Sequence, residues 1–121
     1  MLIGDDDATA TAIQNRLVGA GYGVRRAHSA AEALGALESA RADVILMSLM
    51  LPDTDGLILC STLRAKLPAP VILLSARASE VDRALAIQSG AAALLAIPVD
   101  LDDLLLRVKS LVAGSAASTP G

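Results

Sequence analysis

Aromatic side chains are almost absent from this chain, which has one tyrosine, Tyr22, and no phenylalanine or tryptophan. Without aromatic faces, a site that captures bases or flat ligands by stacking is disfavoured. The core must instead be built from aliphatic side chains and alanine, and hydrophobic residues make up 54% of the sequence. In a chain of 121 residues, that share is enough for one domain with its own hydrophobic core.

The chain also has only one cysteine, no long apolar run and no excess of positive charge. The single cysteine, Cys60, cannot form an internal disulfide and is expected to pack in the core, which favours a reducing, cytoplasmic setting. No apolar run is long enough for a membrane span, and the chain opens without the basic start of a signal peptide. The net charge of -3 excludes a broad attraction to nucleic acid, so we expect no direct nucleic-acid contact by this domain.

Short β-type runs alternate with helical patterns along the chain. An amphipathic stretch follows each of the expected strands, which cover residues 2–3, 23–27, 44–47, 71–74 and 93–97. A continuous aliphatic strand such as 44–47 needs cover on both faces of its sheet. The pattern therefore predicts an α/β fold of five βα units, with a doubly wound parallel sheet, right-handed crossovers and helices on both faces.

Capping and turn residues agree with these boundaries. Two pairs have the spacing of helix starts, and two glycines stand where helices are expected to end. These residues are Ser29 with Glu32, Asp100 with Asp103, Gly21 and Gly90. Periodicity stops near the C-terminus, which predicts a domain over residues 1–113 and a flexible linker over 114–121 that leads toward an output domain.

Three adjacent carboxylates, Asp5, Asp6 and Asp7, follow the first expected strand. Functional groups in an open α/β sheet gather at the carboxyl ends of the strands, and adjacent carboxylates repel one another unless a cation lies near. One interpretation is therefore an Mg²⁺ site. The other is that Asp7 caps the first helix while its neighbours are solvated, and this segment alone does not separate the two. His28, after the second strand, is expected to be solvated and far from this cluster.

Four further motifs follow the acidic residues along the chain. They are the loop Leu49–Gly56, which reads Leu-Met-Leu-Pro-Asp-Thr-Asp-Gly, the pair Ser75–Ala76, the pair Gly90–Ala91, and Pro98. Together they make residues 1–113 resemble the receiver domain of bacterial two-component response regulators. The resemblance implies the flavodoxin-like fold known from CheY, with the strand order 2-1-3-4-5, and a cis bond before Pro98. The last helix is similar to that of the OmpR/PhoB subfamily, whose output is a winged-helix DNA-binding domain.

The chain departs from that family at two positions that carry its chemistry. In the family, a phosphoryl group moves from a partner kinase to an aspartate at the end of the third strand, and a lysine directly precedes the proline. Here those positions are Ser48 and Ile97. A neutral hydroxyl replaces the attacking carboxylate, and an aliphatic side chain can neither pair with a carboxylate nor hold phosphate. The two changes are consistent, because a lysine without an acceptor would be an unpaired charge near the core.

Other positions of the family's site remain open to more than one interpretation. The resemblance places Asp5 and Asp6 in a residual acidic pocket, where Asp6 and the Met50 carbonyl would hold Mg²⁺ weakly or not at all, because the third-strand carboxylate is gone. No other cofactor is expected. Ser75 stands at the family's switch hydroxyl, and here it would bond water or Ser48, or only end its strand.

An enzyme is the competing hypothesis. The segment Asp5–Thr9 also resembles the Asp-x-Asp-x-Thr motif of haloacid-dehalogenase-like phosphatases, in which Asp5 and Asp7 would be the reacting carboxylates and Ser75 the second-motif hydroxyl. The chain is short for that fold, and no lysine stands at a suitable strand end. We therefore expect no enzymatic activity from this domain.

The main hypothesis is a phosphorylation-independent pseudo-receiver that acts through protein contacts. The resemblance places dimer contacts on the fourth helix, fifth strand and fifth helix, so we expect a homodimer through this face and control of a linked, transcriptional output domain. An ordinary solvated helix surface is the alternative for the charged residues there. These candidate interface residues are Asp82, Arg83, Asp103 and Arg107.

Overall fold

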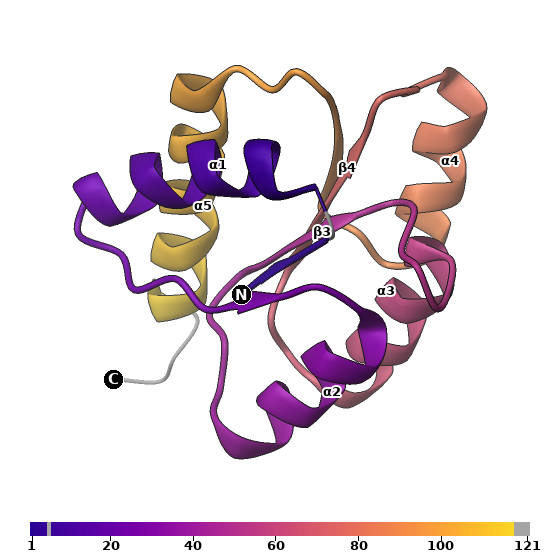
Figure 1. The fold of residues 1–121 in the computed structure, drawn as a ribbon, viewed down its shortest axis with the longest axis horizontal. Helices are drawn as coiled ribbons and strands as arrows, with labels where there is room; N and C mark the ends of the chain where they lie inside the picture. The colour runs from indigo at the N-terminus through magenta and orange to yellow at the C-terminus, as the bar shows by residue number, and fades with distance from the viewer. Residues whose placement is uncertain (5, 118–121) are drawn as a thin grey trace.

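The computed structural model describes residues 1–4 and 6–117, within which strands and helices alternate without exception (Figure 1). None of the helices in these residues is long and apolar enough to cross a membrane. The elements are β1 (Leu2–Ile3), α1 (Asp7–Gly19), β2 (Arg26–Ala27), α2 (Ala30–Ser39), β3 (Ile45–Ser48), α3 (Gly56–Lys66), β4 (Val71–Ser75), α4 (Glu80–Gln88), β5 (Ala93–Ala96) and α5 (Leu101–Ala117).

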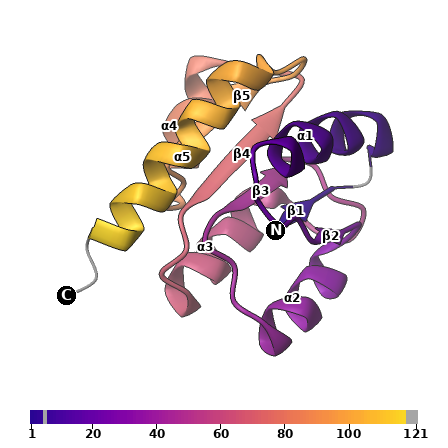
Figure 2. The same ribbon diagram turned by 90° about the vertical axis from the view of Figure 1, so that its left-hand side faces the viewer.

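The sheet has the predicted architecture. Its strands are all parallel and follow the order β2-β1-β3-β4-β5, so the strand order reverses between β1 and β3. Helices α1 and α5 cover one face, while α2, α3 and α4 cover the other (Figures 1 and 2). This doubly wound arrangement places the carboxyl ends of β1, β3, β4 and β5 along one edge, where such folds carry their sites.

Alternation along the central strands builds two hydrophobic layers. In β3, Ile45 and Met47 pack in the layer with α2, α3 and α4, whereas Leu46 packs in the layer with α1 and α5. Strand β4 repeats this period-two pattern, so both central strands are buried on both faces. Cys60 of α3 lies fully buried in the first layer, as predicted, and burial raises the pKa of its thiol. Ser48, the last residue of β3, stands where this packing stops.

Helix caps differ in detail from the sequence prediction. Ser29 accepts a hydrogen bond from the Glu32 amide, at 3.2 Å, as expected for the first half of a capping box. The Glu32 carboxylate, however, accepts from the His28 amide, at 3.3 Å, so the second half is not formed. The complete capping box lies at the start of α4, where Ser79 and Asp82 each accept from the other's backbone amide.

The last helix is longer than predicted. Helix α5 continues through Ala117, past residue 113, where the sequence analysis ends the domain. Alanine has the highest helix propensity, and three of the residues 113–117 are alanines, so the helix extends at little cost. Residues 118–121 of the predicted linker lie outside the described residues. The strand predicted over 23–27 is reduced to β2, an edge strand that pairs only with the two-residue β1.

The turn predictions agree with the backbone. Gly21 and Gly90 both have φ of +97°, a conformation that side chains with a Cβ rarely adopt. The bond between Ile97 and Pro98 is cis, as the family resemblance implied. Gly21 follows the end of α1, and Gly90 follows the end of α4.

Gly56 is the glycine most tightly enclosed by backbone. Its amide donates to the Leu49 carbonyl at 2.7 Å, and a Cβ at this position would lie 2.5 Å from the Ser48 carbonyl oxygen. We expect Gly56→Ala to lower the free energy of unfolding by about 2 kcal/mol, because the loop backbone must shift. Gly35→Ala is the matched control, since a Cβ on Gly35 meets nothing within 4 Å. Urea titration checks both, and equal losses in the two variants would contradict the steric argument.

Candidate functional site

A cavity of about 600 Å³ opens at the carboxyl edge of the sheet. It lies where β3, β4 and β5 end, beside the start of α1 and the first turn of α4. The structure brings together here several residues singled out from the sequence, which are Asp6, Ser48, Met50, Ser75, Asp82 and Ile97. Arg77 also lines the cavity and was not anticipated. Asp5 lies outside the described residues.

Ser48 directs its hydroxyl to its own loop. Its Oγ donates to the Met50 carbonyl oxygen at 3.0 Å. A hydroxyl becomes a nucleophile only when a base removes its proton, and a carbonyl oxygen is not such a base. The same bond uses one of the two lone pairs of the Met50 carbonyl, which the sequence analysis considered as a metal ligand. The end of β3 therefore presents no attacking carboxylate.

Asp6, and not Asp7, caps the first helix. The Asp6 carboxylate accepts from the Thr9 hydroxyl at 2.7 Å and from the Thr9 amide at 3.3 Å. These bonds, the hydroxyl first, lower the pKa of Asp6. The cap prediction for Asp7 is therefore wrong by one residue, because the helix already begins at Asp7.

The described part of the acidic cluster, Asp6 and Asp7, does not form a metal site by itself. Within residues 1–4 and 6–117, no group of three or more His, Cys, Asp or Glu side chains is placed to hold a metal ion. The Asp6 carboxylate already accepts from Thr9, and the Met50 carbonyl accepts a hydrogen bond from Ser48. Among the described residues, which do not include Asp5, too few ligands converge for an Mg²⁺ site.

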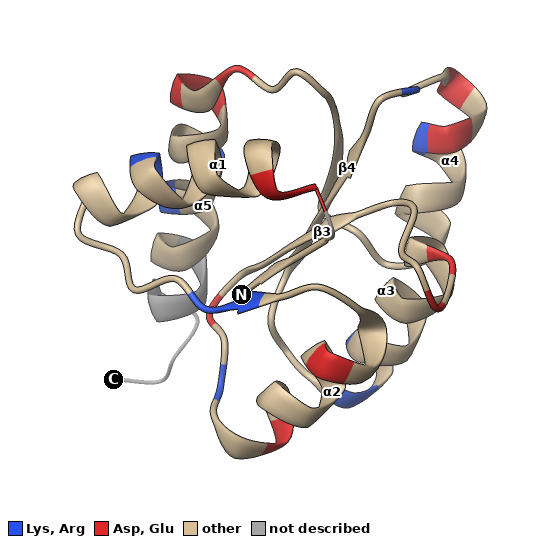
Figure 3. Cartoon of the chain, in the orientation of Figure 1, with Lys and Arg blue, Asp and Glu red and all other residues tan. Residues whose placement is uncertain are grey.

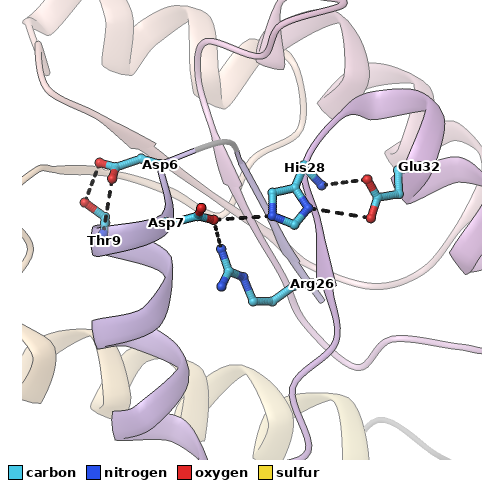
Figure 4. A network of polar contacts seen from close by, with 6 residues as sticks. All are labelled: Asp6, Asp7, Thr9, Arg26, His28 and Glu32. Carbon is cyan, nitrogen blue, oxygen red and sulfur yellow. Dashed lines mark hydrogen bonds and ion pairs between the residues drawn. The ribbon is translucent and has the colours of Figure 1, made fainter.

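Asp7 points away from the cavity into a separate polar network (Figure 4). Its carboxylate accepts from Arg26 at 2.8 Å and lies 3.3 Å from Nε2 of His28, while Nδ1 of His28 lies 3.7 Å from the Glu32 carboxylate. The prediction that His28 lies far from the acidic cluster is wrong, because β2 is the neighbour of β1 and their loops meet. Asp7 is also absent from the cavity lining, where a phosphatase of the alternative type would need it.

Ser75 is buried and bonds within its own loop. Its Oγ donates to the Arg77 carbonyl at 2.8 Å and accepts from the Arg77 amide at 3.0 Å. Of the alternatives considered from the sequence, the bond to Ser48 is not formed. This short ring fixes the start of the β4–α4 loop and leaves the hydroxyl without a proton to offer to a ligand.

Ile97 forms an apolar wall where the family resemblance expected a lysine. It is half-buried, packs against the layer of α1 and α5, and also lines a smaller cavity beside Ile13 and Leu74. No cation from β5 therefore reaches the carboxyl edge. With Ser48, it makes the floor of the main cavity largely uncharged.

Comparison with known proteins decides the family. The profile of the response regulator receiver domain matches residues 1–109. The chain belongs to this family. The receiver is 31% identical to the Bacillus subtilis alkaline phosphatase synthesis transcriptional regulatory protein PhoP, over 99% of this chain and 50% of the relative. It is 35% identical to the Streptomyces coelicolor transcriptional regulatory protein AfsQ1, over 93% of this chain and 50% of the relative. The chain thus spans about half the length of these relatives.

Solved receiver structures agree with this assignment. The receiver domain of the Francisella response regulator 1452 superposes with a TM-score of 0.89 at 30% identity, covering 94% of this chain and 95% of that one. A putative response regulator from Chloroflexus aurantiacus superposes with a TM-score of 0.85 at 35% identity, covering 93% and 95%. The flavodoxin-like fold is therefore confirmed.

Asp53, in the loop after β3, links this loop to helix α2. The sequence analysis did not single out this residue. The carboxylate of Asp53 accepts from the amides of Ala30 and Ala31, at 2.9 and 3.0 Å, and so satisfies the N-terminus of α2. These two bonds hold the pKa of Asp53 below its ordinary value. A Pro-Asp pair in a loop is a turn signal, but nothing in the sequence indicates which distant helix the carboxylate reaches.

The four charged residues predicted for an interface all have partners within the domain. Asp82 completes the capping box of α4, Arg83 donates to the Leu94 carbonyl at 2.7 Å, and Asp103 pairs with Arg107 at 3.1 Å. On α4 and α5, the sequence analysis did not single out the apolar side chains. Large hydrophobic side chains that remain exposed there are Val81, Leu85, Ile87 and Leu106. Val81 and Leu85 are spaced i, i+4, which indicates from the sequence that they share one face of α4.

The bonds of Asp53 predict how stability responds to acid. Because folding lowers this pKa, the stabilisation is complete above the unfolded-state pKa and is lost as pH falls through the folded-state value. We expect Asp53→Asn to be less stable than the parent at neutral pH, with the difference shrinking below about pH 4. Glu38→Gln, on the exposed surface of α2, is the control. Urea unfolding across this range checks the trend, which a constant difference would refute.

Proposed function

We propose that this chain is a phosphorylation-independent receiver domain that controls a linked output through protein contacts. The observation that carries the proposal is the hydrogen bond from Ser48 to the Met50 carbonyl, at the strand end where the family's attacking carboxylate is expected. Ile97 supports it, because an aliphatic wall stabilises no phosphoryl charge. The domain is then a binding module and not an enzyme.

The output of this module is transcriptional in the proposal. Support comes from the names of the relatives PhoP and AfsQ1, both described as transcriptional regulatory proteins and both about twice the length of this chain. A domain of net charge -3 is a poor DNA ligand by itself, so DNA contact would belong to the linked part. This assignment keeps the OmpR/PhoB-type relationship suggested by the last helix.

The proposed contact surface is the face of α4, β5 and α5. Its predicted charged residues already have intramolecular partners, and exposed surface ion pairs contribute little binding energy. The exposed apolar side chains of the two helices are better suited to drive association, since burying one leucine stabilises a contact by about 1.5 to 3 kcal/mol. We propose a homodimer that is held mainly by these side chains.

Phosphorylation is tested directly by weighing the intact protein after incubation with acetyl phosphate and Mg²⁺. We expect no mass gain in the parent, because the Ser48 hydroxyl donates to a carbonyl and not to a base, and the described residues hold no metal site. The double variant Ser48→Asp, Ile97→Lys restores a carboxylate and an ammonium at these two positions and should gain one phosphoryl group. A stable gain in the parent that Ser48→Ala removes would refute the proposal.

The dimer is tested by light scattering over a concentration series. We expect Leu106→Asp, at a side chain 66% exposed on α5, to weaken dimerisation at least about tenfold, because a charge replaces an apolar contact. Ile58→Asp is the matched control, since Ile58 is 62% exposed but lies on α3. Dissociation by the control, or no effect of Leu106→Asp, would place the interface elsewhere.

A further inference from the structure

The cavity at the carboxyl edge is large enough for an organic ligand. Its volume of about 600 Å³ falls within the range of small-molecule sites. Apolar side chains supply much of its wall, and two of them are strongly exposed, Met50 at 80% and Val81 at 68%. Leu74 and Ile97 also belong to this apolar wall.

The polar groups around the cavity are mainly acceptors. Ser48 and Ser75 each donate their hydroxyl proton to a backbone carbonyl, so they offer a ligand only lone pairs. Asp6 and Asp82 add two carboxylates. Arg77 and Ser79 also line the cavity and supply donors. A ligand that carries hydrogen-bond donors nevertheless satisfies the two carboxylates and the two hydroxyl oxygens, which an acceptor cannot.

The charge of the cavity lining also favours a cationic ligand. Two carboxylates, Asp6 and Asp82, and one guanidinium, Arg77, line the cavity, which gives a net charge of -1. Other acidic residues stand in the first turns of α1 and α5 (Figure 3), but Asp7, Asp102 and Asp103 are paired with arginines and lie outside the lining. The charge of the lining itself therefore favours a cation over an anion of the same size.

We propose that this cavity binds a small amphipathic cation, an organic amine whose ammonium faces the carboxylates and whose hydrocarbon part covers the apolar wall. The inference rests on the proposed function in one respect, because a phosphoryl group on Ser48 would fill the same space. The ligand would touch the β4–α4 loop at Arg77 and helix α4 at Val81. It would thereby reach the helix that carries part of the proposed contact surface, in the place of a phosphoryl signal.

The probe is n-hexylammonium, titrated into the protein and followed by the amide NMR signals of Ser48, Ser75 and Arg77. Hexanol and hexanoate are comparison ligands of matched length. We expect hexylammonium to bind about fivefold more tightly than hexanol, since one ion pair in water-like surroundings is worth about that factor. Hexanoate should bind most weakly. No binding of hexylammonium, or equal binding of the three probes, would overturn the inference.

Variants locate the site. Asp6→Asn with Asp82→Asn keeps oxygen acceptors for both helix caps and removes the charges, so the preference for hexylammonium over hexanol should disappear. Asp7→Asn, which removes a carboxylate outside the cavity, should retain the preference and is the control. Ile97→Lys is an independent variant that brings an ammonium into the cavity, and it should lower hexylammonium affinity at least fivefold. Unchanged affinity and preference in all variants would show binding elsewhere and refute the proposal.

The two proposals fail in distinguishable ways. A phosphoryl gain on Ser48 in the mass measurement would overturn the proposed function and leave the amine titration interpretable. Absence of amine binding, with no phosphoryl gain, would overturn only the inference about the cavity.

Discussion

The alternating burial of the two central strands is the constraint on which the whole site depends. Residues of β3 and β4 contribute in turn to the layer of α1 and α5 and to the layer of α2, α3 and α4. A shift of one residue in either strand would exchange the two layers, so the register is tightly fixed. The strand ends are therefore held in place, and Ser48 and Ser75 reach the same edge because β3 and β4 are adjacent and parallel.

At that edge, polar groups are satisfied locally. Ser48 bonds the loop that follows it, Ser75 bonds the loop that follows it, and Asp6 bonds the first turn of α1. Within the described residues, no buried side-chain nitrogen or oxygen lacks a hydrogen-bond partner. Short-range hydrogen bonds therefore fix the side chains of Ser48, Ser75 and Asp6 at this edge.

Sequence reasoning reached the fold and the strand order, because hydrophobic periodicity and the motif spacing both act over long stretches. It also located Ser48, Ser75 and Ile97 at the edge. It was less successful with individual side chains. The choice between Asp6 and Asp7 as the cap depends on a helix start that shifts by one residue, and the contact of His28 with Asp7 depends on which loops become neighbours.

On the surface of α4 and α5, too, the contacts of individual side chains could not be predicted from the sequence. The family resemblance pointed to charged residues on these elements as the contact surface. In the folded domain, Arg83 is turned to the Leu94 carbonyl and Asp103 to Arg107, so their charges are already partnered. Whether a leucine such as Leu106 faces the core or solvent is decided by the packing of the last helix on the sheet, which periodicity constrains but does not settle.

The anchoring of Asp53 to the start of α2 bears on how such sequences are compared. The loop between β3 and α3 has a structural role, since Asp53 joins it to the start of α2 without using any atom of Ser48. The Pro-Asp-x-Asp-Gly stretch of this chain therefore reports on the scaffold. Its presence alone says nothing about whether the residue that ends β3 accepts a phosphoryl group.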